Sequence, residues 1–261
     1  MELELKKECL DTYELGEPQT LTQEETAETI VPDYCPDIAR IISAEGVVCL
    51  HGGTEQDGVT GTVRVTVLYT PENESGVRAL EFAMPFSAQG EGLAGCAHVV
   101  VDTEIELLES RMLNPRKIFT RCKLVTHLAG CRKVCLTISS DAETDPALLV
   151  EKRCCGQTVS LLRQVAEKDL TFSETMSLSL GREGAAELLH CRANGIVTET
   201  KAIGNKLIFK GVFLVSVLYR TTGGQLASAS AELPFSQIME TDSTEENTQV
   251  SMRLRITGTD I

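Results

Sequence analysis

Apolar and polar residues alternate along two long stretches of the chain. In residues 59–69 the odd positions are Val, Gly or Tyr, and in residues 209–219 they are Phe, Gly, Val or Tyr. A period of two with many β-branched residues indicates a strand with one buried face. A turn that contains glycine follows each stretch, and a second stretch follows the turn at residues 77–84 and 225–233. The sequence therefore predicts two β-hairpins.

The two predicted hairpins carry the same motif. Gly61–Tyr69 returns as Gly211–Tyr219, and a Pro-Phe-Ser sequence begins at Pro85 and again at Pro234. The copies lie about 150 residues apart, which is the length of a domain, so we interpret them as a tandem duplication rather than a solenoid. Because proline cannot donate to a strand ladder, we expect Pro85 and Pro234 to end the second strand of each hairpin.

These patterns predict an all-β protein of two tandem, sandwich-like antiparallel domains at residues 1–143 and 146–261, because a one-sided sheet must cover its apolar face. Each domain is also expected to contain one short helix, and in the first domain Pro36 would begin it. Both helices are predicted from apolar residues at helical spacing. These residues are Ile38, Ile41 and Ile42 in the first domain and Ala185, Leu188 and Leu189 in the second.

The first domain continues with two further predicted strands, at residues 99–108 and 117–128. Four residues of the latter strand share one face, and these are Ile118, Cys122, Leu124 and Leu128. The second domain reaches a predicted strand at 250–256 but has no counterpart of residues 111–136. Either this domain is C-terminally incomplete and self-associates through an open sheet edge, or the chain is a piece of a longer protein. We expect the second domain to be the less stable one.

Composition and charge narrow the function classes. The chain has 261 residues and a net charge of −14, which disfavours binding to nucleic acid or to an anionic membrane surface. It contains neither an apolar run long enough to span a membrane nor a signal peptide, so we expect a cytoplasmic protein. In that compartment its ten cysteines would be reduced thiols.

Candidate chemistry is sparse in this sequence. His127, Cys131 and Cys135 form an H-x3-C-x3-C pattern, to which Cys122 or Cys96 could add a fourth ligand, so a metal- or ligand-binding module is the alternative function. In the vicinal pair Cys154-Cys155, we interpret Cys154 as a buried small hydrophobic residue, because it matches Cys9 in the repeat, and we disfavour a redox role for the pair.

Two carboxylates, Asp33 and Asp37, lie four residues apart, but turn and helix-start chemistry explains them better than acid–base catalysis. No phosphate-binding loop or nucleophile motif occurs. We therefore predict a protein that is not an enzyme and has no catalytic, cofactor-binding or metal-ligating residues and no cofactor.

Four motifs follow one another in the first half of the chain. They are Val31-Pro-Asp-Tyr-Cys-Pro-Asp-Ile-Ala-Arg-Ile-Ile42, Gly61–Tyr69, Pro85-Phe-Ser87 and Leu113-Asn-Pro-Arg-Lys117. Their order resembles the SPOCS domain, which is typical of SipL-like sporulation proteins of endospore-forming Firmicutes. The second copy keeps the strand and Pro-Phe-Ser motifs but not the Pro-Asp opening, and the resemblance covers nearly the whole chain as two copies without a LysM domain.

The resemblance implies a structural, protein-binding role in assembly of the endospore coat, in the mother-cell cytoplasm at the forespore surface. Its partners would be spore-coat or forespore-surface morphogenetic proteins. In the family, engagement of the ATPase at the base of the coat is associated with a C-terminal LysM domain, and no such segment occurs here. The resemblance carries over no catalytic residue.

Overall fold

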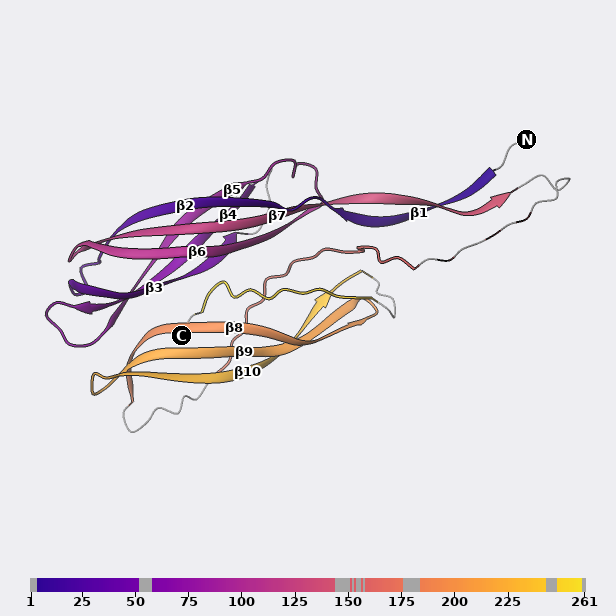
Figure 1. Cartoon of the computed structure of the whole chain (residues 1–261). Helices are drawn as coiled ribbons and strands as arrows, with labels where there is room; N and C mark the ends of the chain where they lie inside the picture. Colours follow the sequence, from indigo (N-terminus) through magenta and orange to yellow (C-terminus); the bar gives the residue numbers. More distant parts are fainter. Residues whose placement is uncertain are drawn as a thin grey trace.

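The computed structural model describes residues 4–51, 58–143, 151, 153, 156, 158–175, 184–242 and 248–259. Every helix or strand assigned within these ranges is a β-strand, and the strands form three antiparallel sheets (Figure 1). The predicted all-β, antiparallel class is therefore confirmed, and the layered sheets are compatible with a sandwich. None of the described segments is a helix long and apolar enough to cross a membrane.

The largest sheet is organised by one long strand. It contains β1 (Glu4–Leu15), β2 (Gln19–Ile30), β6 (His98–Asn114) and β7 (Lys117–Glu143), and we call it the β7 sheet. β2 and β6 pair with the first part of β7 from opposite sides, and β1 pairs with its last part. Each of the other three strands therefore belongs to this sheet because it pairs with β7.

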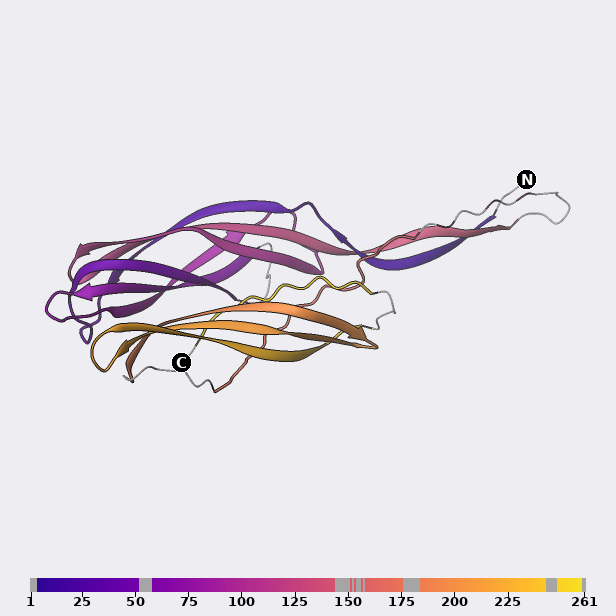
Figure 2. The same ribbon diagram turned by 60° about the horizontal axis from the view of Figure 1, so that its bottom comes forward.

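A first hairpin sheet faces the β7 sheet (Figures 1 and 2). It consists of β3 (Ile38–His51), β4 (Gly58–Pro71) and β5 (Arg78–Gln89), with β4 in the centre. The two sheets share one core, because three valines of β4 (Val63, Val65 and Val67) belong to the same buried cluster as Ile118, Cys122 and Leu124 of β7. The shared face predicted for β7 is thus confirmed: its four residues are all almost completely buried.

A second hairpin sheet consists of β8 (Ala185–Ile203), β9 (Lys206–Thr221) and β10 (Leu226–Glu240), with β9 in the centre. Both hairpin sheets thus have the same antiparallel pairing around a central strand, and both predicted hairpins are confirmed. They also share a close packing contact. A Cβ on Gly61 would overlap the ring of Phe86, and a Cβ on Gly211 would overlap the ring of Phe235.

The two predicted helices are wrong. The residues at helical spacing lie in β3 and β8, and both strands carry two register shifts near their beginning. The shifts fall at Ile38/Arg40 and Ile41/Ser43 in β3, and at Ala185/Glu187 and Leu188/His190 in β8. Each bulge inserts a residue that has no partner, so the spacing of residues on one face grows from two to three. Two bulges in succession imitate the period of a helix.

The expectation that proline ends each hairpin is also wrong. β5 continues past Pro85 to Gln89, and β10 continues past Pro234 to Glu240. Both prolines lie in edge strands, opposite Thr62 and Val212. A proline is tolerated in an edge strand when its nitrogen points away from the neighbouring strand, because no ladder bond is lost there.

The strand predicted at 250–256 is not part of any described ladder. This segment alternates half-buried and exposed residues as a strand does, but it is not assigned to a strand. Its Leu254 packs against β8, where a Cβ on Gly195 would overlap the leucine side chain. The segment therefore lies on the second hairpin sheet without joining a sheet of its own.

Candidate functional site

The loop between β2 and β3 is built around the side chain of Arg116. This guanidinium donates hydrogen bonds to the carbonyl oxygens of Cys35 (2.7 Å) and Val31 (3.0 Å). It also donates to the carboxylates of Asp33 and Asp37, each at 3.1 Å. Both carboxylates of the Pro-Asp motif therefore converge on one arginine that lies about 80 residues further along the chain.

Backbone contacts complete this unit. The amide of Val31 donates to the carbonyl of Arg116, and the amide of Ile38 donates to the carbonyl of Pro115, both at 2.9 Å. The Tyr69 hydroxyl donates to the carbonyl of Pro36 at 3.3 Å, and burial, with contributions from Cys35, raises the pKa of Tyr69 to about 12. The Pro-Asp and Asn-Pro-Arg motifs thus form one structural unit, in which the two aspartates neutralise and orient Arg116.

Large exposed apolar residues gather at the same end of the β7 sheet. Tyr34, at the tip of this loop, has 87% of its surface exposed. Ile30, at the end of β2, and Met112 and Leu113, at the end of β6, are exposed as well. The arginine-centred loop and the adjacent ends of β2 and β6 therefore present apolar side chains to solvent.

A two-stranded arm projects from the other end of the β7 sheet (Figure 1). It consists of β1 and the part of β7 from Cys131 to Glu143, and beyond Cys131 no described strand continues the ladder on the far side of β7. On the outer side of β1, the amide of Tyr13 donates to the carbonyl of Leu162, which is the one bridge found there among the described residues. Most side chains of the arm are exposed. An arm of this kind offers unpaired backbone groups to other strands.

The arm contains a disulfide between Cys9 and Cys135, whose Cα atoms lie 5.7 Å apart. The expectation that every cysteine is a reduced thiol is therefore wrong for this pair. The antiparallel register places Cys9 opposite Thr137 and Cys135 opposite Asp11, so the two cysteines are diagonal neighbours across the strands. Spacing along the sequence could not reveal this, because the residues are 126 positions apart.

The structure does not support a metal site at the H-x3-C-x3-C pattern. His127, Cys131 and Cys135 all lie on β7, where four residues of extended strand span about 13 Å. Zinc needs its ligand atoms within about 2.3 Å, so these side chains are too far apart to share an ion. His127 instead contacts the hydroxyl of Thr20 at 3.0 Å. The described residues contain no group of three or more metal-ligating side chains, and Cys154-Cys155 lies outside them.

The described thiols and histidines show no arrangement typical of a nucleophile and its base. Burial, with the charge of Glu25, raises the pKa of the Cys122 thiol to about 11, so this thiol stays protonated. His51 contacts the hydroxyl of Thr62 at 2.7 Å on an exposed strand face. His190 lies 3.3 Å from the Glu45 carboxylate, which also accepts from an arginine. These contacts are typical of structural pairing between strands.

Polar contacts join the second hairpin sheet and the C-terminal segment to the first half of the chain. Glu187 of β8 accepts from Arg78 of β5 (2.6 Å) and from Arg220 of β9 (2.7 Å). Burial raises the pKa of the Glu187 carboxyl, but the hydrogen bonds and charges of these two arginines together lower the pKa by more than burial raises it, so the net shift is downward. In the C-terminal segment, Arg253 and Arg255 both contact the Asp102 carboxylate of β6. Ion pairs thus form part of the contact between the two halves of the chain.

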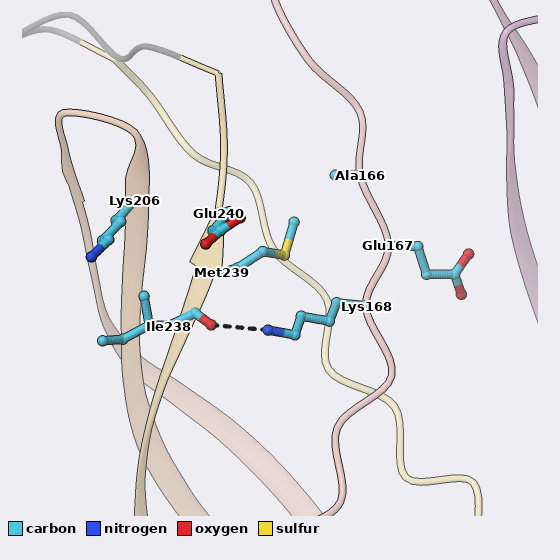
Figure 3. A pocket seen from close by; sticks show the side chains of 7 residues that line it. All are labelled: Ala166, Glu167, Lys168, Lys206, Ile238, Met239 and Glu240. Carbon is cyan, nitrogen blue, oxygen red and sulfur yellow. Dashed lines mark hydrogen bonds between the residues drawn. The ribbon is translucent and has the colours of Figure 1, made fainter.

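A shallow hollow lies beside the start of β9 and the end of β10 (Figure 3). It is lined by Ala166, Glu167, Lys168, Lys206, Ile238, Met239 and Glu240. Its one drawn hydrogen bond joins the Lys168 ammonium to the carbonyl of Ile238 at 3.2 Å. Glu167 points away from the other side chains in this view. The hollow therefore resembles a packing seam between the 164–175 segment and β10 more than a ligand site.

Comparison with known proteins gives one match. Residues 185–261 match the family model described as SipL, SPOCS domain, a stretch that begins with β8 and includes the C-terminal segment. No curated protein and no solved structure matches the chain. The match supports the SPOCS resemblance for the second copy and points to a sporulation-related protein.

Proposed function

We propose that this protein is a non-enzymatic interaction protein of endospore envelope assembly. The observation that carries the proposal is the SPOCS-domain match at residues 185–261. We extend it to the first copy because the two hairpin sheets share their strand order, their paired bulges and their glycine–phenylalanine contact. In this proposal both copies are SPOCS-like domains, and they act in the mother-cell cytoplasm at the forespore surface.

The described surfaces favour binding to proteins. The chain presents an open-edged arm and an apolar loop surface, and both are features through which strands or apolar side chains of a partner can dock. Its charge of −14 disfavours nucleic acid and anionic lipid. The described histidines and thiols are held in structural contacts, which supports a role that does not involve catalysis.

Affinity capture from sporulating cells tests the proposal. The tagged 261-residue chain is expected to recover coat or forespore-surface proteins from sporulating cells and not from vegetative cells. A fluorescent fusion is expected to collect around the forespore. A diffuse fusion and the absence of coat proteins from the captured material would contradict the proposed role.

A further inference from the structure

The two exposed cysteines of the described chain are bonded to each other. Cys9 and Cys135, which form the disulfide of the arm, are both exposed residues. The free cysteines among the described residues are all buried or half-buried, and they are Cys35, Cys49, Cys96, Cys122, Cys131 and Cys191. A thiol in solution therefore meets this disulfide before it meets any other described cysteine.

The arm that carries this disulfide projects away from the core of the first half (Figures 1 and 2). The buried clusters of the described residues contain no residue of β1 and none of β7 beyond Leu128. In the arm, β1 and β7 are held together by their backbone ladder, which runs from Glu4 and Glu143 to Leu15 and Cys131. Opening the disulfide therefore leaves the described core contacts in place.

The charges near the two sulfur atoms favour the release of Cys9 as a thiolate. Lys7 lies two residues from Cys9 on the same face of β1, because side chains alternate along a strand. Asp11 lies directly opposite Cys135, and its carboxylate is 3.9 Å from the Lys133 ammonium. A nearby cation favours the thiolate form of a cysteine, whereas a nearby carboxylate disfavours it. Lys7 therefore helps Cys9 to leave as a thiolate, and Asp11 opposes a negative charge on Cys135.

The outer side of β7 gives the more open approach to the disulfide. An attacking thiolate approaches in line with the sulfur–sulfur bond, so attack on Cys135 comes from the side of β7 that faces away from β1. Beyond Cys131 no described strand occupies that side. On the outer side of β1, by contrast, the Tyr13 amide and the Thr12 hydroxyl both donate to the carbonyl of Leu162, at 2.8 Å and 3.0 Å. Access and charge thus both favour Cys135 as the sulfur that is attacked.

A disulfide in this position is unusual for the setting that the proposed function gives the chain. Thiol buffers keep cytoplasmic cysteines reduced, and the disulfides that do form there are mostly transient or regulatory. Exposed disulfides are also the ones that exchange readily with other thiols, whereas enclosed ones resist reduction. The crosslink can stabilise the first half while it is closed and still exchange, because stability and access to the sulfur atoms are separate properties.

Resting on the proposed function for its cytoplasmic setting, we propose that the Cys9–Cys135 disulfide is an exchange site that bonds the arm covalently to a thiol. The incoming thiolate attacks the Cys135 sulfur with its electron pair and forms a new disulfide there. The bond between Cys135 and Cys9 breaks, and Cys9 keeps the electron pair of that bond, leaves as a thiolate beside Lys7 and takes up a proton from water. One disulfide and one thiol are present before and after the step, so no separate oxidant or reductant is needed. The thiol belongs either to a small molecule or to a cysteine of another protein, two sources with the same chemistry.

Reduced glutathione is the probe for the first test, and it is added to the intact 261-residue chain at neutral pH. N-ethylmaleimide then caps the free thiols and prevents the arm from closing again, and peptide mass spectrometry locates each group. We expect glutathione on Cys135 and the maleimide on Cys9, and we expect the folded chain to open at a rate within about tenfold of the rate in urea. Opening that requires urea, or glutathione on Cys9 instead, would overturn the inference.

Two adjacent lysines of β1 give a matched comparison. Lys7→Gln removes the charge on the face that carries the disulfide and is expected to slow the opening about twofold. Lys6→Gln removes the same charge from the opposite face and is expected to leave the rate unchanged. Both lysines are exposed, so neither change is expected to impair folding. Equal rates for the two variants would overturn the assignment of Cys9 as the leaving sulfur.

A test in cells separates the two sources of the thiol. The tagged chain is recovered from sporulating cells that are lysed in N-ethylmaleimide, and it is analysed without reductant. An adduct of protein size that is lost in Cys135→Ser identifies a protein cysteine, and an adduct of the size of a small thiol identifies a small molecule. Both outcomes support the exchange site. A closed disulfide without any adduct would overturn it, and if coat proteins are still recovered in that case, the proposed function stands.

Discussion

The two hairpin sheets show how differently one strand pattern can be buried. β4 and β9 carry the same motif, the same neighbours and the same close contact between glycine and phenylalanine. β4 lies in a closed core because β7 covers it, whereas the inner face of β9 is partly open. The comparison teaches that alternation determines which residues can be buried, and that the covering strand determines whether they are.

The largest expected effect comes from weakening the β7 cover. Leu124→Ala removes a completely buried side chain and is expected to lower the free energy of unfolding of the first half by about 2–5 kcal/mol. Leu254→Ala, on the half-buried C-terminal segment, is expected to cost about 1 kcal/mol. Chemical denaturation of both variants measures the difference, and equal losses would mean that the two sheets are equally covered.

Reduction of the Cys9–Cys135 disulfide should affect only the half of the molecule that contains β7. The crosslink constrains the unfolded chain between β1 and β7, and its loss is expected to cost the first half about 2–4 kcal/mol. Cys135→Ser should lower the stability as much as a reductant does, and a reductant should then have no further effect. Cys191→Ser, at a free thiol of β8, is the control, and a reductant should destabilise this variant as much as it destabilises the unaltered chain. Thermal unfolding with and without reductant measures the effect in both variants. An unchanged unfolding temperature of the first half would count against a structural crosslink.

Loss of the Arg116 side chain should loosen only the loop between β2 and β3. Arg116→Gln removes hydrogen bonds to two carbonyls and two carboxylates and is expected to cost about 1–3 kcal/mol. Arg153→Gln, at an exposed arginine whose partner among the described residues is nearby Glu151, is the matched control and should be neutral. Hydrogen exchange of the amides at Val31 and Ile38 should accelerate in Arg116→Gln alone.

Acid should weaken the contact between the halves, with the smallest effect of the four. Because the pKa of Glu187 is lowered in the folded protein, its contribution is present above the ordinary carboxyl range and is lost as the pH falls through the lowered value. Limited proteolysis between pH 7 and pH 3 should show easier release of the second hairpin sheet at low pH. In the Glu187→Gln variant, the protease should release the second hairpin sheet more easily already at pH 7, and the rate of release should depend less on pH.

Much of the fold could be predicted from periodicity, and its failures have particular causes. The hairpins around Gly61 and Gly211 and the buried face of β7 follow from alternation. The helix predicted at Ile38–Ile42 failed because two bulges changed the strand period to three. The prediction of a strand at 250–256 failed because a strand also needs a neighbouring strand to pair with, and a local pattern does not show whether such a neighbour exists.

The candidate surfaces were less accessible to sequence reasoning. The convergence of Asp33 and Asp37 on Arg116 joins motifs about 80 residues apart, so only the fold brings them together. The signal in the sequence that could have predicted this contact is that the two turn motifs carry opposite charges. The Cys9–Cys135 pairing and the half-covered face at Val215 depend on strand register and on neighbours, which no local pattern contains.

Amide hydrogen exchange of the intact chain tests the central claim, the unequal cover of β4 and β9, most directly. It compares residues 62–66 of β4 with residues 212–216 of β9, two segments with the same position in the repeat. The uneven cover predicts exchange at least tenfold slower in β4 than in β9. Equal protection of the two segments would contradict the claim that β9 is less completely covered than β4.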